Sequence, residues 1–295
     1  MIVEDVGARC HYQGGNGAEQ RNRYAAGMKT RADNHVGALL KEWRQRRKLS
    51  QLDLASEAET STRHLSFLET GRASPSREML IRLAESLGLP LRERNRLMLA
   101  AGYAPLYAER PLDAPVMARV RSAMDAVLAG HMPFPALAVD RHWNLVAAND
   151  GIPPLLAGID AQLLAPPVNV LRLSLHPDGL STRIINLTEW RHHLLERLRH
   201  QAEVTGDSVL FDLHAELKSY PVPFATRPMQ HRNAVAVPLE LRDPASGNVL
   251  RLISTTTVFG TATDVTLSEL TLECFYPADD ETRFTLLAGL KGSRN

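Results

Sequence analysis

One side of a short amphipathic segment carries side chains that can bind the edges of nucleic-acid bases. At about 100° per residue, His64, Leu65 and Leu68 fall together on one side of residues 62–69. The other side presents Thr62, Arg63, Ser66, Phe67 and Thr70. Arginine is a bidentate donor suited to guanine, serine and threonine can bond to either base type, and an aromatic ring can contact a thymine methyl group. The pattern predicts a helix that reads bases in a DNA groove.

Nearby polar side chains are suited to phosphate oxygens instead. Gln51 begins the preceding helical segment, where a backbone amide and a side-chain amide can together hold a phosphate. Arg72 follows the reading segment, and Arg46 and Arg47 belong to a basic run at residues 44–48. A run of basic residues is often only the solvated face of a helix. Because this run lies beside the predicted base-reading segment, we favour a role in attracting the phosphate backbone of DNA.

Two short helices separated by a tight turn position these side chains. The segments Gln51–Ala58 and Thr62–Glu69 are separated by only three residues, which is typical of a helix-turn-helix. Ser50 and Ser61 stand where each helix needs an N-cap, and Asp53 occupies the third position of the first helix, as in a capping box.

Apolar spacing predicts five helices between Val36 and Tyr103. Leu52, Ala55 and Ala58 form the predicted inward stripe of the first short helix. The other three helices are a helix from Val36 that buries Trp43, a Ser76-capped helix that Gly88 stops, and Leu91–Ala101. The alternative is an all-α domain whose exposed helix faces bind nothing.

The run Arg63-His64-Leu65-Ser66-Phe67-Leu68-Glu69-Thr70-Gly71-Arg72 resembles the helix-turn-helix of the Cro and phage-repressor (xenobiotic-response-element) family, and within it the MmyB-like branch of bacterial transcription regulators. The resemblance implies an all-α helix-turn-helix domain that binds double-stranded DNA. The chain departs from the family at Glu59, where the turn normally has glycine. A left-handed backbone at a non-glycine residue costs about 1 kcal/mol, which we expect the fold to tolerate.

Composition indicates a soluble globular protein of two domains with opposite charge. The chain has 295 residues, 44% hydrophobic and 23% charged, and a net charge of only +1. Residues 36–103 hold twelve Lys and Arg against eight Asp and Glu, whereas residues 112–295 hold sixteen against twenty. A basic domain joined to an acidic one suits a DNA-binding domain beside a regulatory module.

The expected surroundings of the protein are cytoplasmic. No apolar run approaches the roughly 20 residues that span a bilayer, and residues 1–10 lack a signal-peptide core, so we expect no membrane partner. Cys10 and Cys274 are far apart in sequence, and we expect both to be free thiols.

Composition and the positions of glycine and proline divide the chain into four parts. Residues 1–34 are glycine-rich and polar, and we predict a disordered tail. Residues 35–103 form the helix-turn-helix domain, residues 104–115 a proline-punctuated linker, and residues 116–295 the second domain.

Helices and strands mix in the second domain. Strands are expected at Ala136–Asp140, Trp143–Asn149, Ala234–Leu241, Val249–Phe259 and Leu270–Tyr276. Helices are expected at Met117–Leu128, within 151–167, at Asn169–Leu175, Asn186–Thr205 and Asp207–Lys218, and at the chain end. Asn186 and Glu189 form a capping-box-like pair at the start of the long helix, and Gly206 ends it. Together these elements predict an α+β domain, and their order resembles a PAS-like sensor.

Three runs carry the resemblance of the second domain to MmyB-like regulators: residues 139–143, 175–180 and 275–279. The resemblance implies a small hydrophobic ligand, such as a fatty acid, held in a PAS-like cavity. Apolar aromatic residues usually pack in the core of a domain, but the resemblance implies that some of those in the second domain line the cavity. These residues are Trp143, Trp190, Phe211, Phe259 and Phe275. Arg172, His176 and Arg183 are the nearest candidates for an acidic head group.

The patterns that would indicate an enzyme or a metal site are incomplete. His193, Glu196 and His200 share one face of the long helix, but flanking arginines would repel a cation and nothing completes the ligand set. His176 and Asp178 have no serine or cysteine nucleophile beside them. The glycines at 14–17 do not fit a phosphate-binding loop. We therefore expect no enzyme activity, no metal and no cofactor.

These observations favour a sequence-specific, DNA-binding transcription regulator that acts as a homodimer. Its second domain would sense a small hydrophobic ligand, mediate dimerisation, or both. A DNA-tethered enzyme and a scaffold whose second domain binds protein remain as alternatives. An occupied cavity in the second domain would argue against the scaffold.

Overall fold

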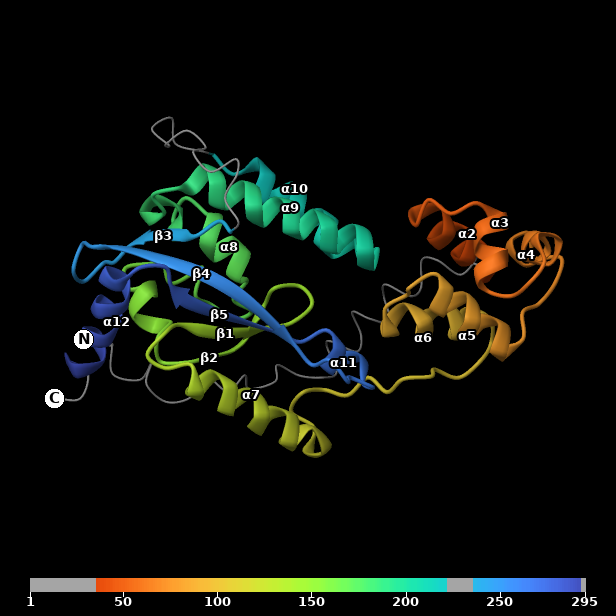
Figure 1. The fold of residues 1–295 in the computed structure, drawn as a ribbon, viewed down its shortest axis with the longest axis horizontal. Helices are drawn as coiled ribbons and strands as arrows, with labels where there is room; N and C mark the ends of the chain where they lie inside the picture. Colours follow the sequence, from red (N-terminus) through yellow and green to blue (C-terminus); the bar gives the residue numbers. More distant parts are fainter. Residues whose placement is uncertain (1–35, 222–235, 293–295) are drawn as a thin grey trace. The chain divides into compact units, whose positions relative to one another are not determined.

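The computed structural model describes residues 36–221 and 236–292. They form two compact units (Figure 1): a helical unit of residues 36–111 with 261–268, and an α/β unit of the described residues in 112–260 and 269–295. The predicted disordered tail and Cys10 lie outside the described residues, as does the start of the strand expected from Ala234.

The helical unit contains the five helices expected before residue 103. They are α2 (Val36–Arg46), α3 (Gln51–Glu57), α4 (Thr62–Glu69), α5 (Arg77–Ser86) and α6 (Leu91–Ala100). Ser50, Ser61 and Ser76 each accept a hydrogen bond from the backbone amide three residues later. The Ser50 amide donates in turn to the Asp53 carboxylate at 2.9 Å, so the predicted capping box is present.

The core of the helical unit corrects the predicted phase of α3. Leu54, Ala55 and Ala58 are buried with Leu65 and Leu68. Leu52, which we expected to face inward, is 66% exposed. In a helix of only two turns, stripes starting at Leu52 and at Leu54 fit almost equally well, and tertiary packing decides between them. His64, expected beside the inward leucines, is only half-buried.

Glu59 adopts the left-handed backbone that the turn between α3 and α4 requires. Its φ is +51°, and the amide of Thr60 donates back to the carbonyl of Ala55 at 2.8 Å, which closes the end of α3. The expectation that a non-glycine residue is tolerated in this conformation is confirmed.

The α/β unit is built on one five-stranded antiparallel sheet in the order β2-β1-β5-β4-β3. The strands are β1 (Ala136–Val139), β2 (Leu145–Ala148), β3 (Leu239–Arg242), β4 (Val249–Val258) and β5 (Thr271–Pro277). The expected β1–β2 hairpin is present, and the central strand β5 comes last in the chain. This arrangement confirms the α+β, PAS-like architecture.

Helices cover both faces of this sheet (Figure 1). The α/β unit contains α7 (Ala118–Gly130), α8 (Val170–Leu175), α9 (Leu187–Thr205), α10 (Ser208–Ser219), α12 (Asp280–Gly292) and the short 3-10 helices η1 (Pro115–Met117), η2 (Pro153–Leu156) and η3 (Leu180–Arg183). The larger core lies between the sheet and α8, α9 and α10, and a smaller one lies under α7 on the opposite face. Because strand side chains alternate, Leu137 and Val139 belong to the first core and Ala136 and Ala138 to the second.

Asn186 does not cap α9 through its side chain as expected. Its amide donates to the Pro238 carbonyl at 2.8 Å, and its side-chain oxygen accepts from the Glu240 amide at 3.1 Å. Asn186 therefore fastens the start of α9 to β3, a contact between distant residues that outweighs local capping. The other end follows prediction, because Gly206 closes α9 with a φ of +67°.

Candidate nucleic-acid interface

The outward side of α4 presents most of the predicted base-reading side chains. Arg63 is exposed, and Thr62, Ser66 and Phe67 are half-buried. The guanidinium carbon of Arg63 lies 5.4 Å from the centroid of the Phe67 ring, one helical turn away. Thr70 is exposed, but its hydroxyl donates to the Ser66 carbonyl at 2.7 Å. The structure therefore places a cation and an apolar ring side by side on this helix.

A buried ion pair holds α4 against the two helices that precede it. Arg44 on α2 donates to both carboxylate oxygens of Glu69, from Nε at 2.6 Å and from Nη2 at 2.9 Å. Gln51 on α3 donates to the same carboxylate at 2.8 Å. The Glu69 side chain is only 1% exposed, so three helices share one buried carboxylate.

The environment of Glu69 keeps its carboxylate charged. Burial tends to raise its pKa, but the hydrogen bonds from Arg44 and Gln51 and the charge of Arg44 together hold the pKa below its usual range. The hydrogen bonds to Glu69 in turn raise the pKa of Arg44. The pair is therefore ionised at neutral pH and fixes the orientation of α4.

Sequence reasoning missed the ion pair, although one signal was present. Glu69 follows Leu65 by four residues, which places it on the inward side of α4. A carboxylate on that side needs a buried partner, but nothing local identifies Arg44, which lies 25 residues away.

The predicted phosphate-binding side chains differ in how free they are. Arg72 is exposed. Arg46 pairs with Glu42 at 2.8 Å, and Arg47 donates to the carbonyls of Leu87 at 2.9 Å and Gly88 at 3.3 Å. Gln51 uses its side-chain amide on Glu69.

The aromatics predicted to line a ligand cavity do not all meet. Trp143, Trp190 and Phe275 contribute to the core between the sheet and α9. Phe259 packs against the smaller core on the α7 side, and Phe211 on α10 is 40% exposed. Three of the five predicted residues therefore share one face of the sheet.

Two of the predicted head-group residues are brought together. Arg172 donates to both carboxylate oxygens of Glu216, at 2.7 and 2.8 Å. Tyr220 donates to Glu216 at 2.6 Å, and the His176 ring packs edge-on against the Tyr220 ring. Burial and the bond to Glu216 raise the pKa of Tyr220 to about 12.

Arg183, the third predicted head-group residue, has different contacts. Its Nη1 donates to the carbonyl of Leu155 at 2.9 Å, and its Nε to that of Arg242 at 3.1 Å. Its Nη2 is buried and has no hydrogen-bond partner in the described part of the chain. Burial lowers the pKa of Arg183.

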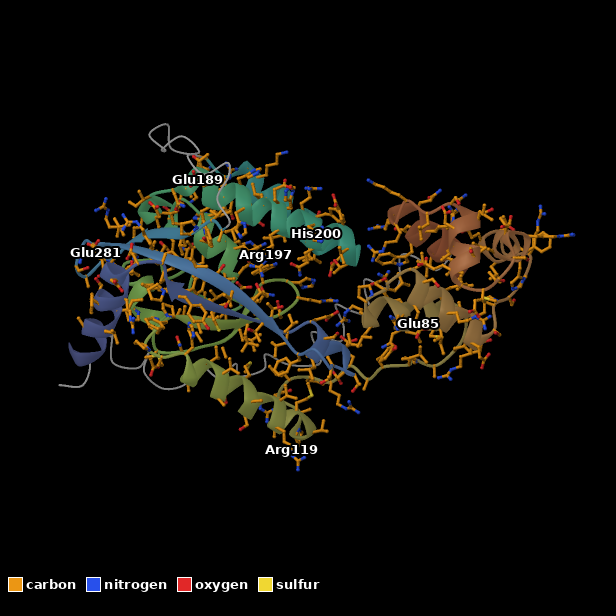
Figure 2. The ribbon with its side chains drawn as sticks, in the orientation of Figure 1. Glu85, Arg119, Glu189, Arg197, His200 and Glu281 are labelled. Carbon is orange, nitrogen blue, oxygen red and sulfur yellow. The ribbon has the colours of Figure 1, made fainter. Side chains whose placement is uncertain are left out.

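A second ion pair with a buried carboxylate, also missed from the sequence, lies beneath α9. Arg197 donates to the two carboxylate oxygens of Glu273 on β5, at 2.5 and 3.2 Å, and to the Thr256 hydroxyl on β4 at 2.8 Å. Its guanidinium carbon lies 4.6 Å from the Trp143 ring centroid. Figure 2 shows Arg197 on the side of α9 that faces the sheet, whereas His200 lies further along the helix.

Trp143 reaches this pair from a strained turn. Its φ is +66°, a conformation that a bulky residue adopts only when its surroundings impose it. The Trp143 indole donates to Gln201 on α9 at 2.8 Å, and Gln201 donates back to the Arg141 carbonyl at 3.1 Å. The β1–β2 turn is thus fastened to α9 at both the ring and the backbone.

Other chemistry is sparse in the described residues. Within 36–221 and 236–292, no three His, Cys, Asp or Glu side chains are placed to hold a metal ion. Glu196, from the predicted helix face, pairs with Arg199. Cys274 is a free, buried thiol whose pKa is raised by burial and by the charge of Glu273. None of the described helices is long and apolar enough to cross a membrane.

A helix-turn-helix joined to a PAS-like α/β unit defines a DNA-binding transcription regulator. Two family models match the chain. The "MmyB-like transcription regulator ligand binding domain" matches residues 120–287, more than half of the chain, and "Helix-turn-helix" matches residues 40–94. The protein belongs to the MmyB-like transcription regulator family.

Individual relatives match smaller parts of the chain. Multiprotein-bridging factor 1 of Debaryomyces hansenii is 36% identical over 63 residues, covering 21% of this chain and 42% of that protein. The same factor of Candida albicans is 34% identical over 65 residues, covering 22% and 43%. The chain therefore spans less than half the length of these curated relatives.

Two solved structures are also similar. The clp gene regulator ClgR from C. glutamicum has 28% identity and a TM-score of 0.21, over 23% of this chain and 84% of that chain. An RNA-binding light-oxygen-voltage receptor has 13% identity and a TM-score of 0.25, over 95% of this chain and 69% of that chain.

Proposed function

We propose that this regulator reads its DNA site as a homodimer through α4, and that a small hydrophobic acid bound in the α/β unit controls that binding. The observation that carries the DNA part is the exposed Arg63 beside the half-buried Phe67, on a helix whose opposite side is fixed by Glu69. A rigidly held helix with a free outward face is what base reading requires.

The stacking of Arg63 on Phe67 suggests which bases are read. A guanidinium that binds the O6 and N7 atoms of guanine lies in the plane of that base. Phe67, against the side of the same guanidinium, would then contact the neighbouring base, where a thymine methyl group is the apolar partner in the major groove. We infer that Arg63 and Phe67 read adjacent guanine and thymine positions, and that Thr62, Ser66 and Thr70 supplement them.

The remaining cations would position the protein without specifying sequence. Arg72 is exposed and can contact a phosphate. The backbone amide of Gln51, at the N-terminus of α3, would contact another. Arg46 and Arg47 would approach the backbone over the Trp43 ring, from which their guanidinium carbons lie 5.6 and 5.3 Å. These contacts would make binding salt-dependent on all sequences.

Selection of DNA from a random pool tests this directly. Full-length protein should enrich one motif, and because half-sites for paired helices normally lie one helical turn apart, the motif should repeat at about 10 base pairs or a multiple of it. Enrichment of no motif would overturn the assignment of α4 as a reading helix.

The homodimer is proposed because one reading helix covers only a few base pairs. Joining two half-site contacts raises the effective concentration of the second one, so a monomeric fragment of residues 36–111 should bind the selected DNA more weakly than the whole chain. Sedimentation of the full-length protein at micromolar concentration, with and without the selected DNA, should give a dimer. A monomer under both conditions would contradict the proposal.

The ligand proposal rests on the aromatic face of the sheet. α9 buries Leu187, Trp190, Leu194, Leu198 and Ala202, and Trp143 and Phe275 complete the same apolar layer. The family description as a ligand-binding domain supports a small molecule there. Arg183, whose buried Nη2 has no hydrogen-bond partner among residues 36–221 and 236–292, is the strongest candidate donor to an acidic head group. Arg172 and His176 are weaker candidates, because Arg172 already pairs with Glu216 and the His176 ring already packs against Tyr220.

Extraction of the purified protein tests the ligand proposal. Organic extracts of denatured protein should contain a fatty acid or similar lipid by mass spectrometry, and added long-chain acids should raise the melting temperature. Arg183→Gln should reduce the shift given by acids but not that given by the matching alcohols. An empty extract with no shift at any chain length would favour a scaffold whose second domain binds protein.

A further inference from the structure

One segment of the sheet-forming part of the chain belongs, by its contacts, to the helical unit. Residues 261–268 connect β4 to β5 and contain the short helix α11 (Val265–Ser268). They lie inside the ligand-binding family match, yet they pack with α6 and with the residues that follow it. We call residues 261–268 the clasp.

A backbone hydrogen bond and an ion pair attach the clasp to the linker after α6, and Val265 of the clasp is buried. The Val265 amide donates to the Ala108 carbonyl at 2.8 Å, within a parallel β-bridge between Ala108 and Asp264. Arg110 donates to the Asp264 carboxylate at 3.0 Å. The Val265 side chain is completely buried and Asp264 is 4% exposed. A backbone bond, an ion pair and a buried apolar side chain thus coincide within a few residues.

Asp264 also folds the clasp itself. Its second carboxylate oxygen accepts the Thr266 amide at 3.0 Å, and its carbonyl accepts the Ser268 amide at 3.0 Å. One carboxylate therefore caps α11 and pairs with Arg110. The shape of the clasp and its attachment depend on the same residue.

The linker is fastened to α6 in turn. The Asn95 side chain accepts the amides of Leu106 and Tyr107, both at 2.9 Å, and donates to the Tyr107 carbonyl at 2.7 Å. Arg92 pairs with Glu109 at 2.7 Å. Asn95 is buried, so these bonds make residues 106–109 part of the α6 surface.

Contacts continue from α6 to the reading helix. α6 packs against α2, and α2 holds α4 through Arg44 and Glu69. The path therefore runs from the β4–β5 connection through the linker, α6 and α2 to the side chains that face DNA. Every step in it is a bond or packing contact of described residues.

We propose that the clasp couples the sheet to the DNA-binding helices: a change in β4 or β5 reaches residues 106–110 through Asp264 and Val265 and alters the stability of α6. The coupling itself depends on neither a ligand nor DNA. Its regulatory consequence, that ligand occupancy is read at α4, rests on the proposed function.

Hydrogen exchange of the full-length chain measures the coupling. Leu252→Val and Leu252→Ala loosen β4 by graded amounts, because Leu252 is completely buried. Each should speed exchange in β4 and also in peptides covering residues 92–110, by at least about threefold for Leu252→Ala. In a chain whose residues 261–268 are replaced by an eight-residue Gly-Ser segment, β4 should still respond and residues 92–110 should not.

A point variant tests the attachment without removing the clasp. Asp264→Asn keeps a side-chain acceptor for the Thr266 amide but loses the charge that holds Arg110. It should speed exchange of residues 104–110 severalfold, and Arg110→Gln added to it should have little further effect. Asp243→Asn is the matched control, because Asp243 caps its own turn between β3 and β4.

Two results would overturn the proposal. One is an equal response of residues 92–110 to the Leu252 variants with and without the clasp. The other is equal exchange of residues 104–110 in the Asp264→Asn and Asp243→Asn proteins. Because neither experiment uses DNA or a ligand, their failure would leave the proposed function standing, and failure of DNA selection would leave the coupling standing.

Discussion

Among the described residues, Glu69 in the helical unit and Glu273 in the α/β unit are buried glutamates that an arginine fork binds, and the two forks lie differently. Glu69 is bound by Arg44 between helices, directly behind an exposed face. Glu273 is bound by Arg197 on the inner face of a sheet, beneath α9. In the helical unit the charge stiffens a surface that faces outward. In the α/β unit it sits beside the aromatic layer where we propose a ligand.

The partners of the two forks extend the contrast. Glu69 has Gln51 as a further donor, so its carboxylate joins three helices. Glu273 has Thr256 on the neighbouring strand, and its arginine lies over Trp143, whose backbone is strained. Backbone strain persists where surrounding contacts over-determine it, often at ligand sites. The comparison indicates a rigid support behind an exposed face in one unit and a polar cluster on the inner face of the sheet in the other.

Removing the carboxylate of the helical fork should have the largest effect. Glu69→Ala leaves Arg44 buried without its counterion and should destabilise the helical unit by about 3–5 kcal/mol. Glu42→Ala, which breaks the exposed pair with Arg46, should change stability by less than about 1 kcal/mol. Urea-dependent hydrogen exchange of peptides from α2–α5 measures both. Similar small losses in the two variants would remove the distinction between support and surface.

The sheet fork should matter less, because Arg197 is partly exposed. Arg197→Ala should destabilise the α/β unit by about 2–3 kcal/mol, since Glu273 loses a charged donor. Arg197→Lys keeps the charge but loses the fork and the planar stack on Trp143, and should recover less than half of the loss. The same exchange measurement on peptides from β4 and β5 decides this. Full recovery by lysine would show that only charge matters there.

Acid should weaken the helical fork. The folded pKa of Glu69 lies below its unfolded value, so the ionised carboxylate stabilises the fold above about pH 4.3, and that contribution is lost as pH falls through the folded pKa. The difference in unfolding free energy between wild type and Glu69→Gln should therefore shrink between pH 7 and pH 3. A constant difference over that range would contradict the direction of the shift.

The smallest expected effect concerns the turn. Glu59→Gly relieves a left-handed backbone, so it should stabilise the helical unit by at most about 1 kcal/mol, offset by the greater freedom of glycine in the unfolded chain. Glu57→Gly, at the last residue of α3, should destabilise by up to about 1 kcal/mol. Thermal denaturation compares the two variants. A clear loss of thermal stability in Glu59→Gly would contradict this, because it would mean that the Glu59 side chain stabilises the fold by more than its backbone strain costs.

Local rules predicted the helical unit well. Caps at Ser50, Ser61 and Ser76 and the stop at Gly88 depend on neighbouring residues, so the sequence contains all that is needed. In α3, Ala55 and Ala58 are buried as predicted, but Leu54 is buried in place of Leu52, and only packing against other helices resolves that choice.

Contacts between residues that are distant in sequence could not be predicted from local rules. Arg197 and Glu273 are 76 residues apart, and Asn186 and Glu240 are 54 apart. Each joins elements that only the folded sheet brings together. For the same reason Phe211 was expected in the core although it lies on the exposed side of α10. Apolar character alone does not determine which face of an element is covered.

The affinity of Arg63→Ala for two kinds of DNA tests the central claim most directly. On the motif selected by the wild-type protein, the variant should lose about 1–3 kcal/mol and relax its preference at one base pair, with little loss on random duplex. Arg72→Ala is the control: it should weaken binding to both DNAs and make the salt slope shallower by about 1. Equal losses of Arg63→Ala on selected and random DNA would contradict the account, because Arg63 would then contact only the backbone.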